Sequence, residues 1–196
     1  MKTMKRQTVF SKWLTLMLLS VTDCSVTYAQ ALPTVSYSAT QIIETVPGPF
    51  SNKIYMAANK ERQDANLGGA IVSTIIRHDK GVAWLLIPSS KHYQEIDIKT
   101  VGLASVHRLL EQGNKIELGY QQLNNTKTKK FAVYTEQETA PSFLWLSEQG
   151  ILLKAEIPKN LATGRPQATI FLTDVEIGEQ DQALFELPKD YTKIKD

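Results

Sequence analysis

Hydrophobic residues recur at every second position along most of the chain, which predicts strands rather than helices. Between residues 151 and 157 the apolar residues share one parity, and Lys154 and Glu156 lie between them. This alternation is typical of a strand with one solvent-facing side. The stretches Val82–Ile87 and Phe143–Leu146 are apolar at both parities, so we expect strands that are covered on both faces.

Turn signals divide the strands into hairpins. His78–Gly81 separates Ile71–Arg77 from Val82–Ile87, and Glu148–Gly150 separates Phe143–Leu146 from the strand after it. Further strands are expected at residues 35–45, 53–57, 61–65, 92–97, 115–123, 130–135 and 167–177. About ten short strands joined by tight turns predict a mainly β domain, built as an antiparallel meander that is either open or closed.

One segment has the period of a helix instead. From Thr100 to Gln112 the apolar residues recur at helical spacing, with Thr100 as a candidate N-cap and Gly113 as the residue that ends the helix. A single amphipathic helix in a β meander must bury its apolar side, so we expect it on the concave face of the sheet.

The N-terminus has the layout of a secretory signal peptide. Basic residues between positions 2 and 12 precede the short apolar run Trp13–Leu19, and small residues follow at Ala29 and Ala31. We therefore expect residues 1–31 to be removed on export to the periplasm, and residues 32–196 to form a single domain. A retained membrane anchor is the alternative.

The cysteine content and the net charge exclude several classes of function. Cys24 is the only cysteine, and the bulky Asp23 before it disfavours lipidation at that position. The remaining chain cannot be a thiol enzyme or form disulfides. Of the 22 basic and 20 acidic residues, four basic and one acidic lie within residues 1–31, so the rest carries a net charge of −1. This charge gives no field that would attract nucleic acid. The basic cluster Lys127, Lys129 and Lys130 is expected in a solvated turn.

Signals of catalysis are absent from the sequence. It has no Gly-x-Ser-x-Gly elbow, no phosphate-binding glycine loop and no zinc-binding His-Glu-x-x-His. We expect neither an enzyme nor a metal or cofactor site. The histidines are His78, His92 and His107. The acids Glu44, Glu61, Asp64, Glu95 and Asp97 are expected on solvated strand faces.

Aromatic and aliphatic side chains on the predicted strands are the most distinctive feature. They form either an ordinary sheet core or the lining of an apolar hollow. A buried acyl chain of about sixteen carbons could gain roughly 10 kcal/mol in such a hollow before ordering costs. The candidate lining residues are Tyr55, Trp84, Leu86, Tyr93, Phe131, Leu144 and Leu146.

The order of several motifs resembles the LolA/LolB-like superfamily of lipoprotein carriers. The motifs are Lys53–Tyr55, Glu61–Arg62, Ile75–Pro88 with Lys91–Tyr93, Leu144–Ser147 and Ala183–Tyr191. The resemblance implies a curved, incomplete antiparallel β-barrel with one or two helices on its concave face. It also implies a role for Arg62 in gating or closure of the hollow.

Together these observations favour a non-enzymatic, monomeric periplasmic protein that binds a lipid or an acylated lipoprotein. The alternative is an envelope-stress sensing or protein-interaction module, which would have the same fold, an envelope protein partner and no lipid ligand. An enzyme is the third class that we considered.

Overall fold

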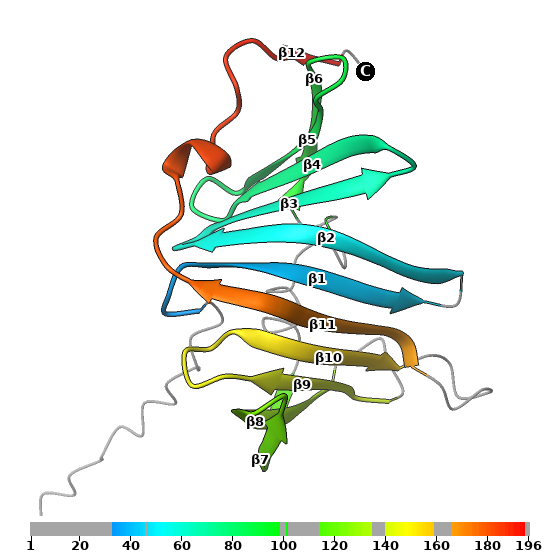
Figure 1. The fold of residues 1–196 in the computed structure, drawn as a ribbon, viewed down its shortest axis with the longest axis vertical. Coiled ribbons are helices and arrows are strands. Elements are labelled where there is room, and N and C mark those ends of the chain that lie inside the picture. Colours follow the sequence, from blue (N-terminus) through cyan, green and yellow to red (C-terminus); the bar gives the residue numbers. More distant parts are fainter. Residues whose placement is uncertain are drawn as a thin grey trace, which may run out of the picture.

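A computed structural model describes residues 33–45, 47–98, 101, 114–134, 140–158 and 166–194. These residues form one curved, open sheet of twelve strands (Figure 1). In chain order the strands are β1 (Tyr37–Thr45), β2 (Gly48–Ala57), β3 (Lys60–Leu67), β4 (Ala70–Arg77), β5 (Val82–Ile87), β6 (His92–Asp97), β7 (Asn114–Leu123), β8 (Thr126–Tyr134), β9 (Ser142–Leu146), β10 (Leu152–Pro158), β11 (Pro166–Ile177) and β12 (Thr192–Lys193).

Two meanders meet at the middle of the sheet. The first runs from β1 to β6 and the second from β7 to β11, and both consist of antiparallel neighbours. They are joined by β1 and β11, with Ile43 opposite Ile170. The predicted hairpins are thus confirmed, but the sheet centre pairs strands from opposite ends of the chain.

The predicted mainly β class and curved, incomplete barrel are confirmed as an open sheet. The short strand β12 is an exception to the antiparallel pattern, because it pairs in parallel with β6. The predicted helix Thr100–Gln112 lies outside the described residues, apart from Val101. Within the described ranges, the structure contains no helix with the length and hydropathy of a membrane span.

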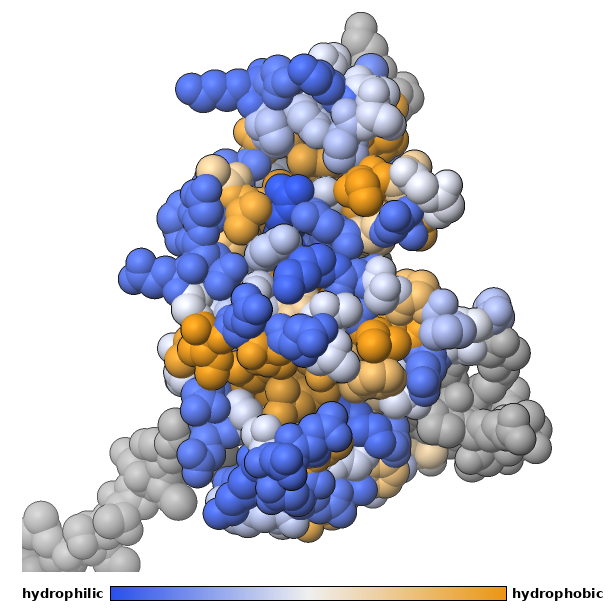
Figure 2. All heavy atoms as spheres, in the orientation of Figure 1, coloured by the Kyte–Doolittle hydropathy of each residue, from blue (hydrophilic) through white to orange (hydrophobic). Residues whose placement is uncertain are grey.

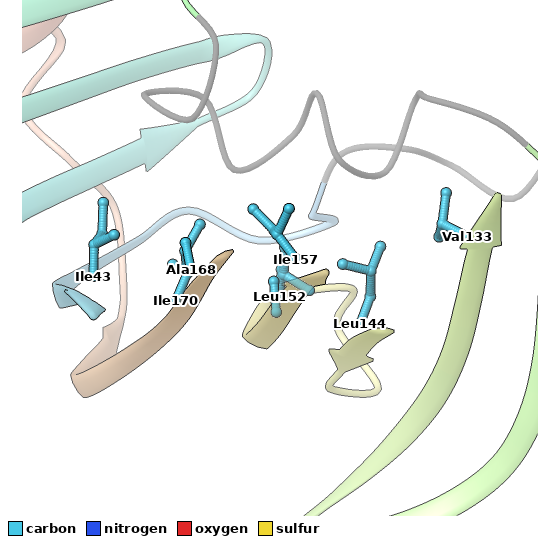
Figure 3. Packing of buried hydrophobic residues seen from close by; sticks show 8 residues of the cluster. Ile43, Val133, Leu144, Leu152, Ile157, Ala168 and Ile170 are labelled. Carbon is cyan, nitrogen blue, oxygen red and sulfur yellow. The ribbon is translucent and has the colours of Figure 1, made fainter. Parts of the chain in front are cut away.

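One face of the sheet, here called the inner face, holds the apolar core. Its largest cluster draws on five adjacent strands, and in Figure 3 the labelled side chains project toward the concave side of the sheet. The cluster consists of Ile43, Val133, Leu144, Leu152, Ala155, Ile157, Ala168 and Ile170. Two further clusters on this face centre on Ile54 and on Ile76. The alternation seen in the sequence therefore directs these apolar residues to the inner face, where they form three clusters.

On the opposite, outer face, charged side chains of β8 and β10 flank the aromatic rings of β9. Lys154 forms an ion pair with Glu156 (2.6 Å), as expected for the wet side of β10. The ammonium groups of Lys130 and Lys154 lie 4.5 and 4.8 Å from the ring centroid of Trp145. The long lysine side chains thus help to cover an indole that is only 5% exposed.

The expected solvated turn around Lys127, Lys129 and Lys130 is wrong, because all three residues lie within β8. β8 pairs on both sides, with β7 and with β9. These two ladders start the strand at Thr126, ahead of its expected start at residue 130.

The C-terminal segment returns along one side of the sheet to its far edge (Figure 1). It contains a short 3-10 helix, η3 (Gln182–Phe185). Arg62 Nη1 donates a hydrogen bond to the carbonyl of Leu184 (3.2 Å), and Arg77 Nη1 donates one to the carbonyl of Phe185 (3.3 Å). The ring of Phe185 is fully buried. Two adjacent strands, β3 and β4, thus hold η3 in place.

Arg77 is also the centre of an ion-pair network. It pairs with Asp79 (2.6 Å) on the turn after β4 and with Glu186 (2.5 Å) just after η3. The hydrogen bond from Arg77 lowers the pKa of Asp79 to about 2. The network ties the C-terminal segment to the sheet with charge-assisted hydrogen bonds.

Candidate functional site

The end of the sheet around the β9–β10 turn carries two surface grooves. The larger, here called the apolar groove, has a volume of about 420 Å³. It lies between the tip of the β7–β8 hairpin and the last residues of β11, with the β9–β10 turn between them. Its lining consists of Leu123, Asn124, Thr126, Ser147, Gln149, Ile151, Leu153, Phe171, Leu172, Thr173, Asp174, Val175 and Ile177. In Figure 2 hydrophobic surface lies just above the blue surface of this hairpin.

The apolar groove exists because neighbouring hairpins differ in length. β7 and β8 extend to the turn at Asn124 and Asn125, whereas β9 ends earlier, at Leu146. The chain reverses at Gly150, whose φ of 78° is accessible to glycine without strain. A short hairpin between two long neighbours leaves a recess, and its size falls within the range of small-molecule sites.

The second groove, here called the lysine-rimmed groove, has a volume of about 330 Å³ and shares Ser147 with the first. Its lining is Tyr120, Lys127, Lys129, Phe131, Leu146, Ser147, Glu148 and Gly150. The Nζ atoms of Lys127 and Lys129 lie 4.3 and 5.5 Å from the ring centroid of Tyr120. Positive charge, part of which is paired with Glu117 (3.2 Å from Lys129), therefore borders an apolar floor, an arrangement suited to an amphiphile with an anionic group.

The seven predicted lining residues fall into two groups on opposite faces. Phe131, Leu144 and Leu146 face inward, and Phe131 and Leu146 line the lysine-rimmed groove while Leu144 is buried in the core. Tyr55, Trp84, Leu86 and Tyr93 face outward on β2, β5 and β6, where Leu86 lies opposite Tyr93. One hollow cannot be lined by all seven. The residues of the apolar groove were not predicted, because they come from strand ends that are distant in sequence.

Arg62, predicted to act in gating, uses its guanidinium to fix the C-terminal segment. Besides Leu184, it donates hydrogen bonds to Asp64 (2.8 Å) and to the hydroxyl of Ser73 (3.2 Å). Its contacts therefore lie on β3, β4 and η3, at a distance along the sheet from both grooves. A role in gating stays a prediction.

Glu61 corrects one expectation, because it is fully buried on the inner face rather than solvated. Gln63 Nε2 donates a hydrogen bond to Glu61 Oε1 (2.5 Å), and His78 Nε2 lies 3.9 Å from Glu61 Oε2. Burial raises the pKa of Tyr37, and the charge of Glu61 adds to this. The inner side of β3 is thus polar, and no alternation of apolar with polar residues marks it in the sequence.

A second polar pair lies on the inner face, where Asn52 Nδ2 donates a hydrogen bond to Gln41 Oε1 (3.3 Å). Within the part of the chain that the structure describes, Gln41 Nε2 and Asn52 Oδ1 are buried without hydrogen-bond partners. One donor and one acceptor therefore stay free, whichever way the two amides are turned.

Comparison with known proteins identifies the fold. No family model and no curated protein matches the sequence. Among solved structures, an uncharacterized conserved protein from Thermus thermophilus matches at a TM-score of 0.61 and 14% identity, covering 82% of this chain and 90% of that one. A chain of the Pseudomonas aeruginosa MucA/MucB complex matches at a TM-score of 0.55 and 14% identity. The match covers 84% of this chain and 59% of that one.

A LolA superfamily protein, NE2245 from Nitrosomonas europaea, is matched at a TM-score of 0.44 and 10% identity, covering 79% of this chain and 91% of that one. That likeness is too weak to support a functional inference. This chain spans only about three fifths of the MucB chains that it matches. LolA superfamily proteins are thus among the solved structures that match, as the resemblance in the sequence predicts, and at these identities the likeness extends to the fold alone.

Proposed function

We propose that this is an exported, non-enzymatic envelope protein that holds an acyl chain of a lipid or an acylated lipoprotein in the apolar groove. The observation that carries the proposal is the groove itself. Its lining includes Leu123 of β7, Leu153 of β10 and Phe171 of β11. A recess of about 420 Å³, in which seven of the thirteen lining residues are aliphatic or aromatic, suits an apolar chain.

The energy of such binding comes from the removal of apolar surface from water. Each buried methylene contributes about 0.8 kcal/mol, and the ordering of a flexible chain takes back part of this. Ile177 is 57% exposed beside the recess, which leaves a large apolar side chain free to contact a ligand. The adjacent lysine-rimmed groove supports an amphiphilic ligand, because Lys127 and Lys129 could attract its anionic group.

The test uses a fluorescent long-chain fatty acid and the exported protein purified from the envelope fraction. Ile177→Arg places a charge in the lining of the apolar groove, and we expect it to weaken probe binding at least tenfold. Ile71→Arg is the matched control, since Ile71 is also an exposed isoleucine on a strand, outside both grooves. It should bind as the unchanged protein does.

Two outcomes would contradict the proposal. One is the absence of probe uptake by the unchanged protein together with the absence of co-purified lipid in its native mass spectrum. The other is equal binding by Ile177→Arg and Ile71→Arg, which would place the ligand elsewhere.

A protein-interaction module is the second candidate, favoured by the solved MucA/MucB complex, in which a chain of this fold binds another protein. Cross-linking in intact cells separates the two functions. A stable protein partner, in the absence of bound lipid, would favour the module over the carrier.

A further inference from the structure

β7 forms one edge of the sheet and is unusually apolar for an edge. It is ten residues long, with a β-bulge between Glu117 and Gly119, and among the described strands its backbone pairs with β8 alone. Three large side chains on it stand out from the surface: Ile116 is 52% exposed, Leu118 49% and Tyr120 59%. Edge strands of soluble proteins are ordinarily kept short, charged or covered, because an open edge pairs with other strands.

The opposite edge of the sheet, at β6, is protected by a further strand. There β6 is flanked by β12, a strand of only two residues that carries Lys193. Lys193 lies 4.0 Å from Glu95 on β6. The chain therefore covers one edge with its own C-terminal segment, and leaves the β7 edge without such cover among the residues that the structure describes.

The charges on β7 complement a second copy of the same strand. Lys115 and Glu117 flank Ile116 on either side, and Glu117 also forms an ion pair with Lys129 of its own chain (3.2 Å). In an antiparallel pair centred on Ile116, each Lys115 lies opposite Glu117 of the other copy, and the two Ile116 side chains meet at the centre. Opposite charges directly across a strand pair are favourable, and so are paired β-branched residues.

We infer that β7 pairs antiparallel with β7 of a second copy, which extends the sheet across a two-fold axis. The contact closes after two copies, because each uses the same edge, so it forms dimers rather than fibres. A contact of two edge strands is at the small end of specific interfaces, and the dimer is therefore expected to dissociate on dilution. This inference is independent of any ligand, and differs from the monomer expected from the sequence.

Sedimentation equilibrium of the exported protein over a range of concentrations tests the dimer. A monomer at every concentration would overturn the inference. Charge reversal then tests the register: Lys115→Glu and Glu117→Lys should each weaken the dimer about tenfold, because each places like charges opposite one another. The double variant restores opposite charges and should recover the dimer. A dimer that is indifferent to these changes does not use β7.

A cysteine at the two-fold axis gives a second readout that does not depend on affinity. In a Cys24→Ser background the chain has no cysteine. The cysteine introduced by Ile116→Cys can then form a disulfide only with the same residue of a second copy. We expect rapid disulfide formation under mild oxidation for Ile116→Cys, and little for Leu67→Cys. Leu67 is a matched control, because it is 58% exposed and lies at the end of β3 beside a turn. Equal linking of both variants would reflect random collision and would overturn the inference.

Discussion

The two ends of the sheet are completed in different ways. At the β3–β6 end, the C-terminal segment returns over the strands, and Arg62 and Arg77 bind its carbonyl groups. At the β7–β10 end nothing comparable is present among the described residues: two grooves open at the surface, and Ile116 and Tyr120 stand exposed. One end of the sheet is thus covered by the chain's own C-terminal segment, and the other end carries the two grooves and an uncovered edge strand among the described residues.

This difference suggests that the two ends of the sheet have different roles. Buried charge with several hydrogen bonds is costly to disturb, and therefore suits a part of the molecule that only has to stay folded. Exposed apolar surface is unfavourable in water unless something binds it. We expect stability to depend on the closed end and binding to depend on the open end.

Phe185→Ala is expected to give the largest effect. The ring is fully buried, and its loss should lower the free energy of unfolding by about 3–5 kcal/mol, measured by urea denaturation. Leu184→Ala, at a partly exposed neighbour, should cost less. Acyl probe binding should be unchanged wherever the variant is folded. A parallel loss of probe affinity would show that the two ends are coupled.

Arg62→Ala should have a smaller effect, about 1–2 kcal/mol, because it removes hydrogen bonds to Leu184, Asp64 and Ser73. Hydrogen exchange should become faster at the amides of η3, while probe affinity stays constant. Arg62→Lys keeps the charge but cannot reproduce the planar set of donors, so it should recover little stability. If either variant changes probe binding or release, the predicted gating role of Arg62 is supported instead.

Asp79→Asn should give the smallest effect, visible mainly as a function of pH. The pKa of Asp79 is lowered to about 2, so its ionised form stabilises the fold above the ordinary carboxyl pKa. That contribution is lost as the pH falls toward about 2. The variant should be less stable than the unchanged protein at pH 7, by under about 1 kcal/mol because Asp79 is partly exposed. The two stability curves should converge between about pH 4 and pH 2.

The strands could be predicted from the sequence because alternation and turn residues are local signals. The hairpin of β9 and β10 is an example: Lys154 and Glu156 face outward and Gly150 forms the turn, as predicted. Partners that are distant in sequence leave no such signal. Nothing in the period of β1 indicates that it lies beside β11 rather than beside another strand.

The candidate site could not be predicted for the same reason. Leu123 and Phe171 reach the apolar groove from strand ends in different parts of the sheet. The aromatic residues that were predicted to line a hollow are divided by the pleat, since Trp84 faces outward and Phe131 inward. Glu61 is expected on a solvated strand face, where most acids of a β protein lie, although the sheet buries it.

The central pairing of β1 with β11 has a consequence for how the chain folds. Each hairpin can form from neighbouring residues as soon as they are available, but Ile43 and Ile170 can meet only when almost the whole chain is present. Contacts of such long sequence separation slow folding. Until residues 166–177 arrive, β1 and β10 each expose an unpaired edge where the finished protein has its centre. A chain cut short before that segment should therefore aggregate rather than fold into half a sheet.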